Sequence, residues 1–68
     1  MEERVYKIVE LAGSAGSIEE AIQTAMSRAE QTLRNLRWFE VIQIRGHAEK
    51  GAALQYQVII KAGFTLEA

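Results

Sequence analysis

Apolar and polar positions alternate along three parts of the chain, and each alternating part predicts a β-strand. Residues 4–12 are rich in valine, isoleucine and tyrosine, residues 38–48 alternate from Trp38 onward, and residues 54–66 alternate most regularly. Because a strand places every second side chain on one face, we expect one face of the last strand to form the core. That face carries Leu54, Tyr56, Val58, Ile60, Ala62, Phe64 and Leu66.

Between the first two strands the apolar spacing becomes that of a helix. The segment GSAGS, residues 13–17, is expected to end the first strand, and Ser17 with Glu20 fits a capping box. The spacing predicts an amphipathic helix from Ile18 to Asn35. Its apolar stripe consists of Ile18, Ala21, Ile22, Ala25, Met26, Ala29, Leu33 and Leu36.

The predicted order is β-α-β-β, which defines an α+β subunit. If the first strand pairs with the third, the three strands form an antiparallel sheet that curls around the single helix. One helix covers only one face of such a sheet, and Phe39 and Val41 are expected toward that covered face. The uncovered face is expected to carry Trp38, Ile42, Ile44 and Ile59. A contiguous apolar patch of this kind indicates an association or ligand surface.

The length of the chain favours an oligomer. Its 68 residues are expected to form a single domain, residues 1–68, and a core of this size supplies only roughly 3–5 kcal/mol. The sequence has no cysteine and one histidine, His47, so neither disulfides nor a conventional zinc site can reinforce the fold. Self-association is the remaining source of stability.

Charge and hydropathy exclude other partners. The formal net charge is −1, whereas nucleic-acid binding needs a concentrated basic surface. No segment approaches the roughly 20 apolar residues that cross a bilayer. The N-terminus is charged and then strand-like, which differs from a secretory signal, so we expect a cytoplasmic protein.

Candidate chemistry points to binding rather than catalysis. The Gly13–Gly16 segment precedes a helix N-terminus, where backbone amides can hold an anion, but it lacks a full phosphate-binding motif, and a plain turn explains it better. No nucleophile and base can be paired, so no catalytic residue and no metal site is predicted.

Trp38 and Gln57 are the most informative pair. Both are expected on the uncovered face, where an indole can stack on a flat aromatic ligand and an amide can bond the edge of a pyrimidinedione ring. Arg45 lies on the same strand as Trp38 and can bind a phosphate. The alternative is that Trp38 anchors a subunit contact, and composition and spacing favour the anchor over the ligand platform.

The chain resembles the dodecins, small flavoproteins of bacteria and archaea, over nearly its whole length. The resemblance rests on VYKIVEL near the start, TLRNLRWFEV and IRG in the middle, and YQV and GFTLE toward the end. It implies a hollow homododecamer in which flavins stack between the tryptophans of neighbouring subunits. Trp38 then matches the stacking residue, Gln57 the residue that bonds the isoalloxazine edge, and Arg45 the arginine near the phosphate or the paired rings.

The resemblance also implies a second ligand and a role. Some bacterial dodecins bind coenzyme A, to which Tyr6, Arg28 and Arg34 would contribute here, although Thr65 stands where close relatives often carry arginine. The implied function is flavin storage with quenching of the excited state and no catalysis. The expected ligand is FMN, and riboflavin and FAD stay open as alternatives. The alternatives are a structural or coenzyme A-binding oligomer without flavin, and a flavin-dependent reductase.

Overall fold

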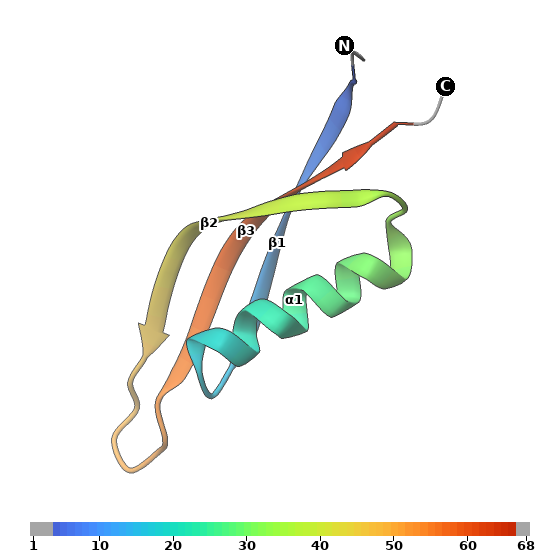
Figure 1. Cartoon of the computed structure of the whole chain (residues 1–68). Coiled ribbons are helices and arrows are strands. Elements are labelled where there is room, and N and C mark those ends of the chain that lie inside the picture. The colour runs from blue at the N-terminus through green and yellow to red at the C-terminus, as the bar shows by residue number, and fades with distance from the viewer. Residues whose placement is uncertain (1–3, 67–68) are drawn as a thin grey trace.

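One helix and three strands make up the fold, in the order predicted from the sequence. The computed structural model describes residues 4–66 and contains β1 (Tyr6–Ala15), α1 (Ile18–Thr32), β2 (Leu36–His47) and β3 (Gln55–Thr65). The sheet order is β1-β3-β2 with both pairings antiparallel, so the β-α-β-β antiparallel prediction is confirmed. The helix runs across one face of the sheet, and β2 bends strongly along its length (Figure 1).

The helix begins as its capping residues predict. The Glu20 backbone N–H donates to the Ser17 hydroxyl oxygen at 3.1 Å, and that hydroxyl donates to the Glu20 carboxylate at 3.2 Å. Glu19 and Glu20 place negative charge in the first turn, where it is favourable to the helix dipole. These contacts fix the direction in which α1 leaves β1.

Small residues bring the helix very close to the sheet. Ala21, Ala25 and Ala29 are buried at intervals of four residues and face β1 and β3. A Cβ atom added to Gly13 of β1 would overlap the Ala21 carbonyl oxygen and lie 2.9 Å from the Ala25 Cβ. The glycine at position 13 is therefore required by the close approach of α1.

Two predicted boundaries were wrong by three residues, and the others lie within two residues of the observed ends. β1 continues through Gly13 to Ala15, because these residues still pair with Tyr56, Gln57 and Val58 of β3. The helix ends at Thr32 rather than Asn35, since Leu33 already has an extended backbone at φ −113° and ψ 137°. Asn35 turns the chain into β2 with a left-handed φ of 60°, a conformation that asparagine tolerates better than most residues.

The core is small and lies between α1 and β3. Val58, Ile60 and Ala62 of β3 are buried as predicted, and Ile60 and Val58 are the largest fully buried side chains of the described residues. Leu54 and Leu66, predicted on the same face, lie just outside β3 and are exposed. Phe39 was expected in the core but is 47% exposed, because α1 packs on β1 and β3 rather than on β2.

A β-bulge changes which side chains of β2 share a face. Val41 pairs with Ile60 and Gln43 with the adjacent Ile59, so Ile42 is an extra residue between them. Beyond the bulge Ile44 pairs with Val58, which faces the helix. The prediction that Ile44 shares a face with Trp38 was therefore wrong, since the inserted residue reverses the alternation.

Candidate functional site

The face of the sheet opposite α1 carries the residues predicted to bind a ligand, and we call it the open face. Directly paired residues of neighbouring strands lie on the same face, so the register defines its members. They are Tyr6, Ile8, Glu10, Ala12 and Ser14 of β1, Gln57, Ile59, Lys61, Gly63 and Thr65 of β3, and Trp38, Glu40, Gln43 and Arg45 of β2. Trp38, Gln57 and Arg45 are thus all on the open face.

Trp38 lies directly on the backbone of the central strand. It pairs with Gly63, and a Cβ atom added to Gly63 would overlap Cε2, Cζ2 and Nε1 of the indole. These three atoms are consecutive along the edge of the indole that carries the ring N–H, so this edge lies over the glycine. Trp38 is half-buried at this contact, while Gly63 is buried.

Tyr6 is the aromatic neighbour of Trp38 across the sheet. The two ring centroids are 6.3 Å apart and the ring planes are inclined by 59°. This is a tilted contact within the range of distances at which aromatic rings attract each other. Tyr6 comes from β1, which reaches Trp38 because Ile8 pairs with the same Gly63 from the other side.

Arg45 and Gln57 form a polar group at the other end of the open face. They are direct partners, and Gln57 also pairs with Ser14 of β1. The Arg45 Nη2 atom donates to the Gln43 side-chain oxygen at 2.7 Å, which holds the guanidinium over the sheet. The β2 bulge brings Arg45 to this face, because strict alternation from Trp38 would place it on the helix side.

A single subunit does not bring Trp38 together with Gln57 and Arg45. The partner of Trp38 is Gly63 and the partner of Arg45 is Gln57, six positions apart on β3. At the rise of a β-strand, this separation is about 20 Å, which exceeds the length of a three-ring aromatic system. The two groups share a face without sharing a pocket.

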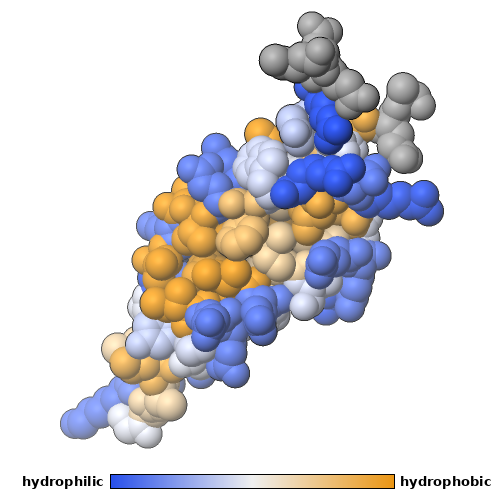
Figure 2. All heavy atoms as spheres, viewed as in Figure 1, coloured by the Kyte–Doolittle hydropathy of each residue, from blue (hydrophilic) through white to orange (hydrophobic). Residues whose placement is uncertain are grey.

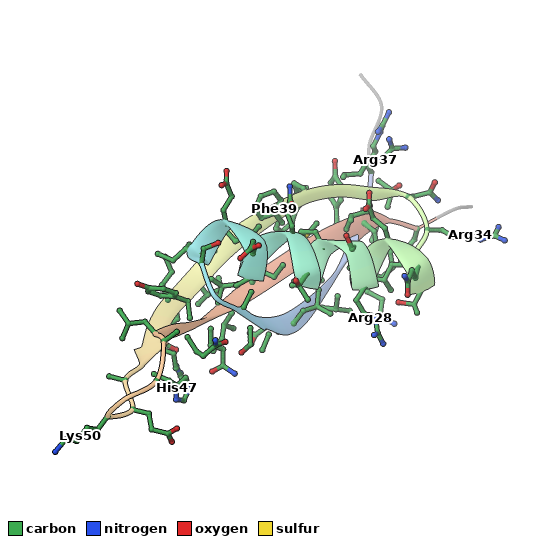
Figure 3. All side chains as sticks on the ribbon, turned by 90° about the horizontal axis from the view of Figure 1, so that it is seen from below. Arg28, Arg34, Arg37, Phe39, His47 and Lys50 are labelled. Carbon is green, nitrogen blue, oxygen red and sulfur yellow. The ribbon has the colours of Figure 1, made fainter. Side chains whose placement is uncertain are left out.

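The three residues predicted for coenzyme A are likewise not assembled in one subunit. Tyr6 lies on the open face, whereas Arg28 belongs to α1 on the opposite side. Arg28 helps to line a groove of about 740 Å³ between α1 and β1, together with polar helix residues such as Gln23 and Thr24. Figure 3 shows Arg34 projecting from the turn after α1, away from Arg28.

Gly63 and Tyr6 were not identified as parts of the tryptophan site from the sequence. A glycine inside an otherwise regular strand is a signal that another group approaches the backbone closely, and Gly63 carried that signal. Tyr6 was placed in the first strand but assigned to coenzyme A, because its register with Trp38 depends on the pairing of both outer strands with β3.

Neither a membrane helix nor a metal cluster occurs in the part of the chain that the structure describes. Residues 4–66 contain no helix long and apolar enough to cross a bilayer. Within the same residues, no three side chains of histidine, cysteine, aspartate or glutamate are grouped so that they would hold a metal ion.

Comparisons with known proteins define the class of molecule. The dodecin family model matches residues 5–67. A dodecin from Thermus thermophilus is 51% identical over 65 residues, which is 94% of each chain. The chain belongs to the dodecin family.

Solved structures agree with this assignment. A mutant of the T. thermophilus dodecin superposes with a TM-score of 0.89 at 46% identity, covering 97% of this chain and all of that one. A dodecin from Streptomyces coelicolor has a TM-score of 0.89 at 42% identity, covering 100% of this chain and 99% of its own. Dodecins are flavin-binding proteins, and membership makes the chain a binding protein rather than an enzyme.

Proposed function

We propose that this protein stores flavin, with FMN as its ligand, by stacking the isoalloxazine ring on Trp38 at contacts between subunits of a hollow homododecamer. The observation that carries the proposal is the indole of Trp38, which lies on the open face against the backbone of Gly63 and is only half-buried there. The exposed part of an aromatic ring is a surface on which another flat ring stacks favourably.

The site in this proposal is completed by neighbouring subunits. The distance of about 20 Å along β3 keeps Gln57 and Arg45 away from the Trp38 of the same chain. A ring stacked on Trp38 therefore meets Gln57 and Arg45 of a neighbouring subunit, whose amide bonds the ring edge and whose guanidinium faces the phosphate. A dodecamer is consistent with membership of the family and supplies such contacts.

Storage follows from the chemistry of the stack. An excited flavin held against an indole accepts an electron from it and returns rapidly to the ground state. The bound flavin is therefore non-fluorescent and protected from photochemical reactions. The charged side chains of the open face near Trp38, Glu40 and Lys61, are cross-strand partners, which favours mutual charge compensation over substrate turnover. In this proposal the protein acts in the cytoplasm as a reservoir.

Coenzyme A is the second candidate ligand, at a different place. Arg28 offers a cation at the groove between α1 and β1, which has polar side chains along its helix wall. Tyr6 is excluded from this groove by its position on the open face, and Thr65 supplies no charge. Flavin remains the ligand that the open face supports best.

A fluorescence titration tests the proposal. Dilute FMN and riboflavin are titrated separately with apoprotein, and we expect near-complete quenching that saturates at equimolar flavin and subunit. Size-exclusion chromatography of the same sample checks that the flavin elutes with a large oligomer. An unchanged flavin signal beside an intact oligomer rejects flavin storage and favours the coenzyme A alternative, and steady oxidation of NADH by the loaded protein favours a reductase.

A further inference from the structure

We propose that Gly63 is the positioning residue of the stacking site, because its missing side chain allows the Trp38 indole to lie directly against the backbone of β3. This inference rests on the proposed function and names a residue that acts on flavin only through Trp38. It predicts that a single methyl group under the indole weakens flavin binding without any change in the residues that touch the ligand.

The first support is steric. A Cβ atom on residue 63 would overlap atoms of both indole rings, so an alanine there and the present indole position are mutually exclusive. Gly63 is buried by this contact, and Trp38 is its direct cross-strand partner. Glycine weakens a strand interior, so its presence in the central strand needs a compensating reason, and the indole provides one.

The second support is the orientation of Tyr6. Its ring is inclined by 59° to the indole at a centroid distance of 6.3 Å, so it borders the tryptophan and does not lie parallel over it. The indole therefore has two fixed neighbours, the backbone of β3 at Gly63 and the tilted ring of Tyr6, and neither is stacked parallel to it. Because Trp38 is only half-buried between them, part of the indole stays available to a second flat ring.

A purely structural role is the competing explanation. An aromatic side chain packed over a glycine of the neighbouring strand can stabilise a sheet without any ligand. The two roles differ in what a methyl group at residue 63 changes. A structural contact alters the melting temperature, whereas a positioning contact alters the environment of Trp38 and the affinity for flavin.

The test compares Gly63→Ala with a matched control, Gly46→Ala. A Cβ atom at Gly46 of β2 would meet its nearest neighbour, the Gln55 carbonyl oxygen, at an ordinary 3.8 Å. We expect Gly63→Ala to shift Trp38 emission and raise its accessibility to acrylamide in the apoprotein. We also expect the Kd for FMN to rise about tenfold, the upper end of what one stacked aromatic pair contributes. Gly46→Ala should match the wild type.

The outcomes separate the two proposals. Unchanged Trp38 emission and unchanged FMN affinity in folded Gly63→Ala overturn the positioning role, as does a lowered Tm alone. Absence of flavin binding by the wild type overturns flavin storage itself, and the apoprotein emission then still reports whether Gly63 sets the indole position.

A second pair of variants keeps the test open if Gly63→Ala does not fold. Trp38→Phe is compared with the double variant Gly63→Ala/Trp38→Phe, because a phenyl ring lacks the indole atoms that a Cβ would overlap. We expect the double variant to fold and to bind FMN with nearly the affinity of Trp38→Phe, because the methyl group no longer meets the indole. A double variant that also fails to fold, or that binds FMN about tenfold more weakly than Trp38→Phe, would show that the glycine is not required by the indole.

Discussion

Trp38 lies outside the helix–sheet core, since its indole contacts the face of β3 opposite α1. Trp38→Ala should therefore leave the fold and the oligomer intact while it removes the stacking plane. We expect the Kd for FMN to rise by about tenfold or more, and any flavin that still binds to fluoresce. Titration of FMN fluorescence checks the affinity, and far-UV circular dichroism checks the fold. Wild-type affinity in the variant would contradict the stacking role.

Arg45 makes a different prediction from Gln57, although the two side chains are cross-strand partners. If Arg45 faces the ligand's phosphate, Arg45→Gln should weaken FMN by about tenfold, the order of a charge-assisted hydrogen bond, and leave riboflavin nearly unchanged. Gln57→Ala should weaken both flavins alike, because both carry the same ring edge. Competitive titration of the two ligands measures the ratio, and an equal loss of both in Arg45→Gln would assign Arg45 to the ring.

At the scale of residues, alternation predicted the faces of Trp38 and Gln57 correctly but placed Ile44 on the wrong face. The reason is the extra residue Ile42, which reverses the alternation in the second half of β2. The extra residue is an ordinary isoleucine, and no glycine stands next to it in the sequence to mark the bulge. The contact between Trp38 and Gly63 was equally hidden, because it depends on a register between strands that are distant in sequence.

The packing of α1 on β1 depends on a single glycine, and this gives a prediction at the scale of elements. Gly13→Ala places a methyl group against the Ala21 carbonyl oxygen, which is backbone and cannot rotate away. The helix must lift, at a cost of about 1–3 kcal/mol, as expected for overpacking. Gly16→Ala is the control, since its Cβ would meet nothing closer than 3.9 Å. Urea unfolding measures both variants, and equal stability would contradict the close approach.

The elements themselves could be predicted well from local patterns, and their ends less well. The capping residues Ser17 and Glu20 located the start of α1 correctly. The apolar stripe continued past its end through Leu33 and Leu36, because both residues are still half-buried after the backbone has left the helix. Asn35 was the available signal for the turn, and Gly13 was misread as a strand terminator because glycine serves both turns and close contacts.

The molecule as a whole is too extended for a self-sufficient domain of its length. Its radius of gyration is 14.5 Å, against about 11 Å for a compact domain of this size. Apolar side chains gather beside α1 (Figure 2). They lie on the same face of the sheet as the helix, over β2, which the helix does not reach. Phe39 and Ile44 belong to this side, with 47% and 49% of their surface exposed. We therefore expect other subunits to cover it.

Assembly and folding should then be linked, which is the prediction at the largest scale. If subunits unfold as they separate, Tm should rise by roughly 5–10 °C for each tenfold increase in protein concentration.

Phe39→Ser tests which surface carries this linkage, because Phe39 lies on β2 beside the helix and contributes little to the core of its own chain (Figure 3). The variant should dissociate at concentrations where the wild type and Lys50→Ser, at the tip of the β2–β3 turn, remain assembled. Sedimentation velocity measures the assembly and differential scanning calorimetry the Tm. A Tm independent of concentration, with Phe39→Ser fully assembled, would mean that the subunit folds alone and that its exposed apolar side is not an interface.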